Sequence, residues 1–117
     1  MRKITMAAMV LALLPAMAAG WETRDGDVPL SKAALRDALV GQVLTFCDDG
    51  KSRFYDDGRY SYTYGQGGIA YGHYSLNGDG TACIGFVGGS SRCDLYVRNG
   101  DRLVLVTEDG DRFPVRP

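Results

Sequence analysis

The chain has 117 residues, of which 13 are Lys or Arg, 14 are Asp or Glu and one is His, so its formal net charge at pH 7 is −1. A chain of this length predicts one small domain. Because the basic residues are scattered singly among acids instead of forming a stripe, the composition argues against a nucleic-acid partner and against an anionic membrane surface.

The N-terminus has the three-part pattern of a secretory signal peptide. Met-Arg-Lys is a basic start, residues 6–18 form an apolar run, and the Ala-x-Ala that ends this run supplies the small residues needed for cleavage. The apolar run is too short for a helix that crosses a bilayer. We therefore expect residues 1–20 to be removed, leaving residues 21–117 as a single exported domain, periplasmic or secreted, without a membrane span.

The segment 31–40 predicts a short helix. Ser31 is a good N-cap, and Leu30 before it is placed to pack on Leu35 in the first turn. Gly41 follows the last apolar residue, where a glycine often ends a helix. We expect the apolar stripe of this helix to pack against a sheet as a plug or lid.

From Gln42 onward the apolar period changes from 3.6 to 2, which predicts strands. The expected strands are 42–47, 51–55, 59–64, 69–76, 81–87, 92–98, 102–107 and 112–115. The run 102–107 is continuously apolar, as in a strand that is covered on both faces. The sequence predicts a mainly β fold, a small antiparallel meander or barrel of seven or eight strands with one short N-terminal helix after the signal peptide.

The paired acids of the two Asp-Asp-Gly triplets, 48–50 and 56–58, raise the question of a metal site or an acid/base pair. Asp and Gly are also the residues that tight turns prefer, and we interpret both triplets as hairpin turns. Aligning Gly80 with the invariant glycine of a calcium loop puts Phe86 where a bidentate Glu is needed. We expect no metal and no other cofactor, with a loose surface calcium site at the Asp-rich turns as the alternative.

Catalytic patterns are missing from the sequence as well. The one histidine, His73, has no nucleophile-elbow motif to accompany it. Strand alternation puts His73 on the face opposite Tyr74 and Leu76, which predicts that it faces solvent. The acids lie mostly in turns, where water keeps carboxyl groups at their ordinary pKa values. We therefore interpret the protein as non-enzymatic, with no catalytic residue.

The aromatic residues give the strongest hint of a binding surface. Tyr60, Tyr62 and Tyr64 share one face of a strand, which we expect to be buried; the alternative is a barrel mouth that contacts a partner. The longest uncharged connection between aromatic strands is 65–71. The candidate partner-binding residues are Tyr64, Gly67, Gly68 and Tyr71. Their expected partner is an unknown protein or a small ligand.

Three cysteines allow one intrachain bridge with three possible pairings. Cys83 and Cys93 flank a Gly-Gly-Ser-Ser turn signal, and a three-residue loop at 87–89 would place them opposite each other, so this pair is expected. Cys47 would then be either buried and inert, or exposed and available for an intermolecular bridge.

Four segments carry a resemblance: GQVLTFCDDGKSRFYDDGRY at 41–60, AYGHYSLNGDGTACIGF at 70–86, SSRCDLYVRNGD at 90–101 and LVTEDG at 105–110. They resemble a group of small exported alphaproteobacterial proteins of unknown function, which have a leading helix, an aromatic strand and a cysteine pair in late strands. This resemblance implies a β-barrel-like fold and the Cys83–Cys93 pair, and it brings no activity with it.

Two shorter segments, TFCDDGKS at 45–52 and GGIAY at 67–71, carry a weaker similarity. They resemble periplasmic C-type lysozyme inhibitors, which are small exported β-barrels that insert a loop into the lysozyme cleft. This resemblance implies an alternative function, inhibition of a lysozyme-type glycosidase through the loop from Gly67 to Tyr71.

The sequence predicts a mature protein that has lost its signal peptide and contains one disulfide bond. The mature N-terminus is expected between Ala19 and Trp21, and a Cys83–Cys93 bridge closing so short a loop should add roughly 2–3 kcal/mol to the free energy of unfolding. Intact-mass analysis with thiol labelling should find one intrachain bridge, with Cys47 as the cysteine outside it. A peptide map that places Cys47 in the intrachain bridge would contradict the assignment.

Overall fold

The structure is a computed structural model that describes residues 20–117. The signal peptide predicted at 1–20 therefore lies, except for Gly20, outside the described residues. Between residues 20 and 117, no helix is long and apolar enough to cross a membrane.

The described residues form one short helix and nine strands. They are β1 (Asp27–Pro29), α2 (Lys32–Leu39), β2 (Val43–Thr45), β3 (Lys51–Phe54), β4 (Arg59–Thr63), β5 (Ile69–Leu76), β6 (Thr81–Phe86), β7 (Ser91–Asn99), β8 (Arg102–Val106) and β9 (Arg112–Pro114). The predicted mainly β fold with one short helix is confirmed, and the predicted strands differ from the observed ones mostly by one or two residues at their ends.

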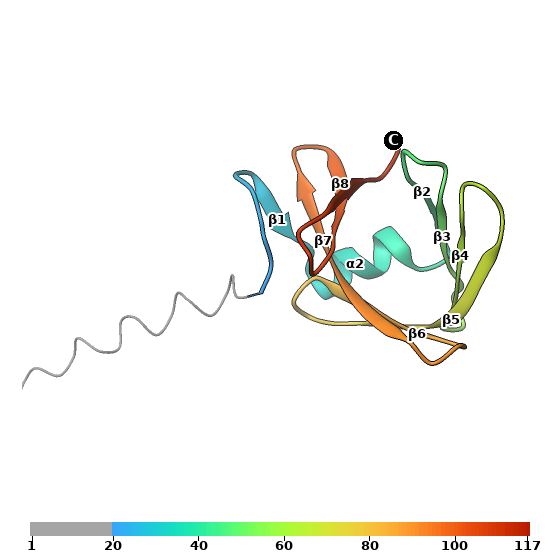
Figure 1. Ribbon diagram of the computed structural model, residues 1–117. Coiled ribbons are helices and arrows are strands. Elements are labelled where there is room, and N and C mark those ends of the chain that lie inside the picture. The colour runs from blue at the N-terminus through green and yellow to red at the C-terminus, as the bar shows by residue number, and fades with distance from the viewer. Residues whose placement is uncertain (1–19) are drawn as a thin grey trace, which may run out of the picture.

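Strands β2 to β9 pair antiparallel in sequence order, and the sheet curls into a half-barrel (Figure 1). The two edges of this sheet meet at an isolated bridge between Phe46 and Val115. Beside the bridge, the backbone N–H of Arg116 donates to the carbonyl oxygen of Thr45 at 2.8 Å. The predicted meander is confirmed, and its closure is limited to this short seam.

The paired acids lie in turns, as predicted. The Oδ1 of Asp48 accepts a hydrogen bond from the N–H of Gly50 at 2.9 Å, and the Oδ1 of Asp57 accepts one from the N–H of Arg59 at 3.1 Å. Such bonds from an Asp side chain to its own turn favour Asp at these positions. Among the described residues no group of three or more His, Cys, Asp or Glu is placed to hold a metal ion.

Helix α2 fills one end of the half-barrel. It begins after Ser31, whose hydroxyl accepts a hydrogen bond from the N–H of Ala34 at 3.1 Å. Leu35 and Leu39 are fully buried in the same cluster as the inward-facing side chains of the sheet. Figure 1 shows α2 within the ring of strands, so the predicted plug is confirmed.

Strand β8 is covered on both faces, as its continuous apolar run predicts. Leu103 and Leu105 belong to the inner core inside the half-barrel. Val104 and Val106 belong to a second, outer cluster, against which Trp21 packs from the N-terminal segment. The N-terminal segment therefore covers the outer face of this part of the sheet.

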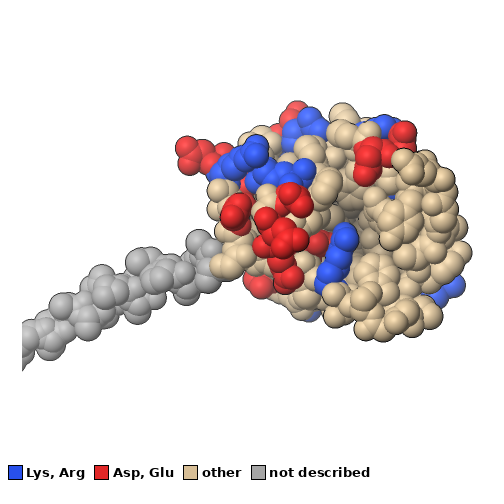
Figure 2. Space-filling model, in the orientation of Figure 1, with Lys and Arg blue, Asp and Glu red and all other residues tan. Residues whose placement is uncertain are grey.

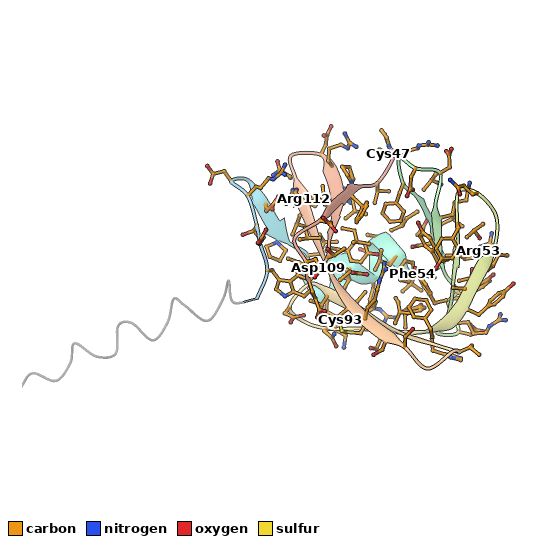
Figure 3. The ribbon with its side chains drawn as sticks, in the orientation of Figure 1. Cys47, Arg53, Phe54, Cys93, Asp109 and Arg112 are labelled. Atoms are coloured by element: carbon orange, nitrogen blue, oxygen red, sulfur yellow. A yellow bond between two sulfur atoms is a disulfide. The ribbon has the colours of Figure 1, made fainter. Side chains whose placement is uncertain are left out.

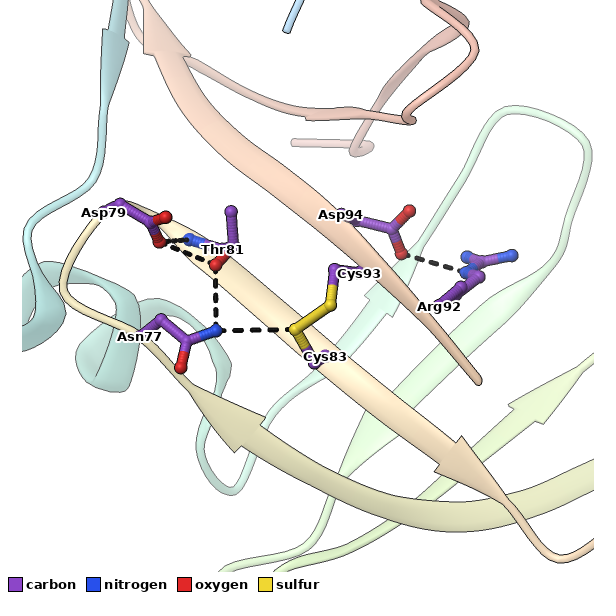
Figure 4. Close-up of a disulfide and its surroundings, with 7 residues drawn as sticks. All are labelled: Asn77, Asp79, Thr81, Cys83, Arg92, Cys93 and Asp94. Carbon is purple, nitrogen blue, oxygen red and sulfur yellow. Dashed lines mark hydrogen bonds and ion pairs between the residues drawn. A yellow bond between two sulfur atoms is a disulfide. The ribbon is translucent and has the colours of Figure 1, made fainter. Parts of the chain in front are cut away.

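The disulfide joins Cys83 to Cys93, as predicted (Figure 4). The two cysteines are directly opposite partners on β6 and β7. The backbone N–H of Phe86 donates to the carbonyl oxygen of Ser90 at 2.8 Å, which leaves the expected loop of three residues between the strands. Cys47 is free and exposed, so the alternative of a buried thiol is wrong and the alternative of an exposed one holds.

Strand β1 is missing from the predicted strands, because a three-residue strand ending in Pro29 is too short to show a periodic pattern. It pairs antiparallel with β7, from Asp27 opposite Asn99 to Pro29 opposite Val97. This pairing extends the sheet next to the end of β6. Long-range contacts, rather than local sequence, therefore decide that this segment is a strand.

The side chain of Asp27 ties β1 to β9 through an ion pair that is mostly buried. Arg112 donates two hydrogen bonds to the Asp27 carboxylate, at 2.8 and 2.9 Å, and Asn99 donates a third at 2.8 Å. The side chain of Asp27 is 0% exposed and that of Arg112 (labelled in Figure 3) is 12% exposed. The bonds from Arg112 hold the pKa of Asp27 well below its usual range, against the opposing effect of burial.

We predict that Asp27→Asn destabilises the fold by on the order of 3 kcal/mol, because it leaves Arg112 without its carboxylate partner. The folded protein keeps Asp27 ionised while the unfolded chain takes up a proton below about pH 4, so the contribution of Asp27 is lost as the pH falls. Urea unfolding should show the gap between wild type and variant shrinking from about pH 4 to about pH 2.

The matched control is Asp57→Asn, because Asp57 pairs with Arg59 where both side chains are more than half exposed. Exposed ion pairs contribute little, so its unfolding midpoint should match that of wild type. A gap between Asp27→Asn and wild type that does not change with pH would contradict the role given to the ion pair.

Candidate functional site

The open end of the half-barrel, away from α2, holds a cavity of about 260 Å³. It is lined by Phe46, Asp48, Tyr60, Tyr62, Tyr64, Phe86, Arg92, Leu105, Thr107 and Phe113. Six of these ten residues are aromatic, so most of the wall is apolar. Figure 2 shows a hollow inside the ring of strands, with acidic side chains gathered over the neighbouring β8–β9 turn.

Tyr60 lies where the cavity meets the core. Its ring packs edge-on against Phe54 at 5.0 Å and against Phe86 at 6.1 Å between centroids. Its hydroxyl shares a hydrogen bond with the buried Ser52 hydroxyl at 2.8 Å. Burial raises the pKa of Tyr60 to about 12, so this residue stays a neutral hydrogen-bonding group at ordinary pH.

Tyr62 and Tyr64 continue the aromatic wall toward the rim. Their rings pack edge-on with centroids 5.0 Å apart, and Tyr64 is 54% exposed. The Tyr62 hydroxyl occupies the space that a Cβ at position 50 would need. Gly50 is therefore required by the close approach of Tyr62, and any larger residue there would push this ring out of place.

The polar part of the site is an ion pair between Arg92 and Asp94 on the inward face of β7. The Nε of Arg92 donates to Oδ2 of Asp94 at 3.0 Å (Figure 4). The Asp94 side chain is 4% exposed, whereas that of Arg92 is 47% exposed and lines the cavity. Burial raises the pKa of Asp94, while Arg92 acts in the opposite direction.

Within residues 20–117, Arg92 bonds to Asp94 through Nε, and its two terminal nitrogens make no hydrogen bond. Asp94 therefore fixes the Nε side of the guanidinium group and leaves the other nitrogens available. A planar guanidinium with free terminal nitrogens matches a carboxylate or phosphate group.

Sequence reasoning missed Arg92 and Asp94. The alternation of Leu95 and Val97 with Asp94 and Tyr96 indicates a strand with two different faces. In the structure Tyr96 belongs to the inner core, whereas Leu95 and Val97 belong to the outer cluster. The available signal was that Arg92 and Asp94 alternate with apolar residues and share a face with Tyr96. Hydrophobicity alone, however, favours the face with Leu95 and Val97 as the inward one.

The four candidate partner residues lie on the β4–β5 hairpin. Tyr64 and Tyr71 border one open groove, together with Ile69 and residues of the β6–β7 hairpin. Tyr71 is 57% exposed on the outer face of β5. Gly67 and Gly68 form the tip of the hairpin, with φ of +105° and +92°, and do not line the groove.

The expected surface position of His73 is confirmed, because its side chain is exposed on the outer face of β5. Its cross-strand partner on β4 is Arg59. The structure therefore keeps His73 on the outer face of the sheet, opposite to the face that lines the cavity.

Comparison with protein-family models, with curated proteins and with solved structures found no match. The resemblances to exported alphaproteobacterial proteins and to lysozyme inhibitors therefore stay predictions.

Proposed function

We propose that this protein is a non-enzymatic, exported binding domain, periplasmic or secreted, that holds a small amphiphilic ligand in the open end of its half-barrel. The observation that carries the proposal is the aromatic cavity of about 260 Å³ with Arg92 at its wall. Export is supported by the signal-peptide pattern and by the Cys83–Cys93 bridge, since disulfides persist in oxidising compartments.

The apolar walls define one half of the ligand. Aromatic rings such as Tyr62, Tyr64 and Phe86 offer contact area with little loss of conformational entropy. The cavity is slightly smaller than the 300–1,000 Å³ of sites for drug-sized molecules. The ligand is therefore a small ring or short chain, or the apolar end of a longer molecule, and it enters at the end that α2 leaves open.

Arg92 defines the other half of the ligand. Its guanidinium group is held from behind by the buried Asp94, so little side-chain entropy is lost when a ligand binds. A carboxylate or another planar anionic group pairs with such a guanidinium through two parallel hydrogen bonds. The proposed ligand class is thus a small anion with an apolar body.

The test uses 1-anilinonaphthalene-8-sulfonate as a fluorescent probe and a matched pair of competitors, phenylacetate and 2-phenylethanol. Wild type should bind the probe, and phenylacetate should displace it more effectively than the neutral alcohol. Arg92→Met should weaken phenylacetate binding about tenfold, as expected for the loss of a hydrogen bond to a charged group, and should leave the alcohol unaffected.

Arg98→Met is the control, because Arg98 is exposed on the same strand and does not line the cavity. It should behave as wild type. If the probe does not bind, or if Arg92→Met and Arg98→Met bind phenylacetate equally well, the cavity proposal fails. Circular dichroism of each variant checks that the fold is retained.

A second candidate function is inhibition of a lysozyme-type glycosidase through the loop from Gly67 to Tyr71. It is supported by the exposure of the apolar side chains that flank this tight turn, since Ile69 is 50% and Tyr71 is 57% exposed. An exposed tyrosine next to a glycine turn supplies contact area to a partner at low entropic cost.

For this candidate, the purified mature protein is assayed against a C-type lysozyme. Inhibition should be present at micromolar protein and should be lost in Ile69→Ala and in Tyr71→Ala, because both remove apolar contact area beside the turn. Val28→Ala is the control, since Val28 is 62% exposed on β1 and does not line the groove that Ile69 and Tyr71 border. Absence of inhibition, or equal inhibition by all variants, would exclude this function.

A further inference from the structure

Part of the outer face of the half-barrel, over β7 and β8, is covered by the N-terminal segment of the chain, whereas the part over β2 to β5 is not. On β7 and β8, Trp21 packs over the outer cluster. On β2 and β5 the outward apolar side chains stay in contact with solvent, with Val43 at 44%, Ile69 at 50% and Tyr71 at 57% exposure. We call this uncovered surface of strands β2 to β5 the β2–β5 outer face.

Strand pairing brings basic and aromatic residues together on this face. Arg53 lies between Val43 on β2 and Ser61 on β4, and Ser61 in turn lies opposite Tyr71 on β5. Lys51, two residues from Arg53, points to the same side of its strand. Figure 3 shows Arg53 directed away from the ring of strands, whereas the neighbouring Phe54 points into it.

The β2–β5 outer face is positively charged in a chain that is slightly acidic overall. A shallow depression of about 220 Å³ on it is lined by Lys51 and Arg53 and contains no Asp or Glu among its lining residues. Neither cation forms an ion pair with another residue between 20 and 117. Both charges are therefore available to an anionic partner.

Arg53 is also held in place before any partner binds. The guanidinium carbons of Arg53 and Arg59 lie 5.4 and 4.8 Å from the centroid of the Tyr55 ring. Such cation–π contacts restrict the guanidinium groups and lower the entropic cost of pairing with a carboxylate. Arg59 also pairs with Asp57, so Arg53 and Lys51 carry the free positive charge.

From these observations we infer that the β2–β5 outer face binds an acidic glycan. The carboxylates of the glycan pair with Arg53 and Lys51, and one sugar ring packs on the exposed Tyr71. Neighbouring strands are about 4.8 Å apart, so the face is roughly 14 Å wide from β2 to β5, which suits a short saccharide segment. This site is separate from the cavity, which lies on the inward side of the sheet.

The aromatic residues favour a glycan over a single-stranded nucleic acid. Nucleic-acid surfaces stack successive bases on several aromatic rings along a basic groove. Here the Tyr55 ring is already in contact with two guanidinium groups, so Tyr71 remains as the ring available for stacking. One ring beside two free cations fits a charged sugar better than a run of bases.

The experiment measures binding of the folded mature protein to oligogalacturonate by calorimetry, beside a neutral malto-oligosaccharide and a single-stranded oligonucleotide. Oligogalacturonate should bind, more weakly as salt is raised, and the neutral glycan should not. Arg53→Gln and Tyr71→Ala should each lower the affinity about tenfold, whereas Arg98→Gln should not change it.

Arg92→Met separates this inference from the proposed cavity, because it should leave oligogalacturonate binding intact. The inference is overturned if oligogalacturonate does not bind, if the neutral glycan binds equally well, or if the oligonucleotide binds more tightly. Equal affinities of Arg53→Gln and Arg98→Gln would overturn it as well. A folded Tyr71→Ala that binds about tenfold more weakly, together with Arg98→Gln of wild-type affinity, supports it.

Discussion

The burial of Leu35 and Leu39 inside the curled sheet is the contact on which the other features of this protein depend. A short meander that curls on itself leaves two open ends, and its inward face needs apolar side chains to fill the space between the walls. The two leucines of α2 fill one end and join the inner core with Phe54 and Tyr60. Because α2 occupies this end only, the aromatic wall of β4 remains accessible at the other end, where the cavity lies.

Two ion pairs of the same kind have different consequences because of where they lie. Asp27 and Arg112 are both mostly buried, and the carboxylate accepts further hydrogen bonds, so the pair is satisfied within the protein and fastens β1 to the sheet. Asp94 is almost as deeply buried, but the side chain of its partner Arg92 is about half exposed and keeps free terminal nitrogens. The first pair therefore stabilises the fold, and the second presents a charged group to the cavity.

The period of two along each strand lets one short sequence build two separate surfaces. On β4, Tyr60 and Tyr62 face the core and the cavity, while Ser61 lies between Arg53 and Tyr71 on the outer side. A substitution on one side changes little on the other, which makes the cavity and the β2–β5 outer face separately testable. A substitution at Gly50 is an exception, because a side chain there would take the space of the Tyr62 hydroxyl and disturb the cavity wall.

Local sequence was enough to predict the helix at 31–40, the order of the main strands, the turns and the expected Cys83–Cys93 pair, because caps, periodicity and turn residues act over a few neighbours. Packing between distant segments, by contrast, turns Asp94 and Tyr96 inward, makes Asp27–Pro29 a strand, and brings the sheet edges together at Phe46 and Val115. An alternating pattern shows that a strand has two faces but not which of them is inside when both are buried. That choice depends on how the sheet curls around α2, which is set by contacts between residues far apart in the chain.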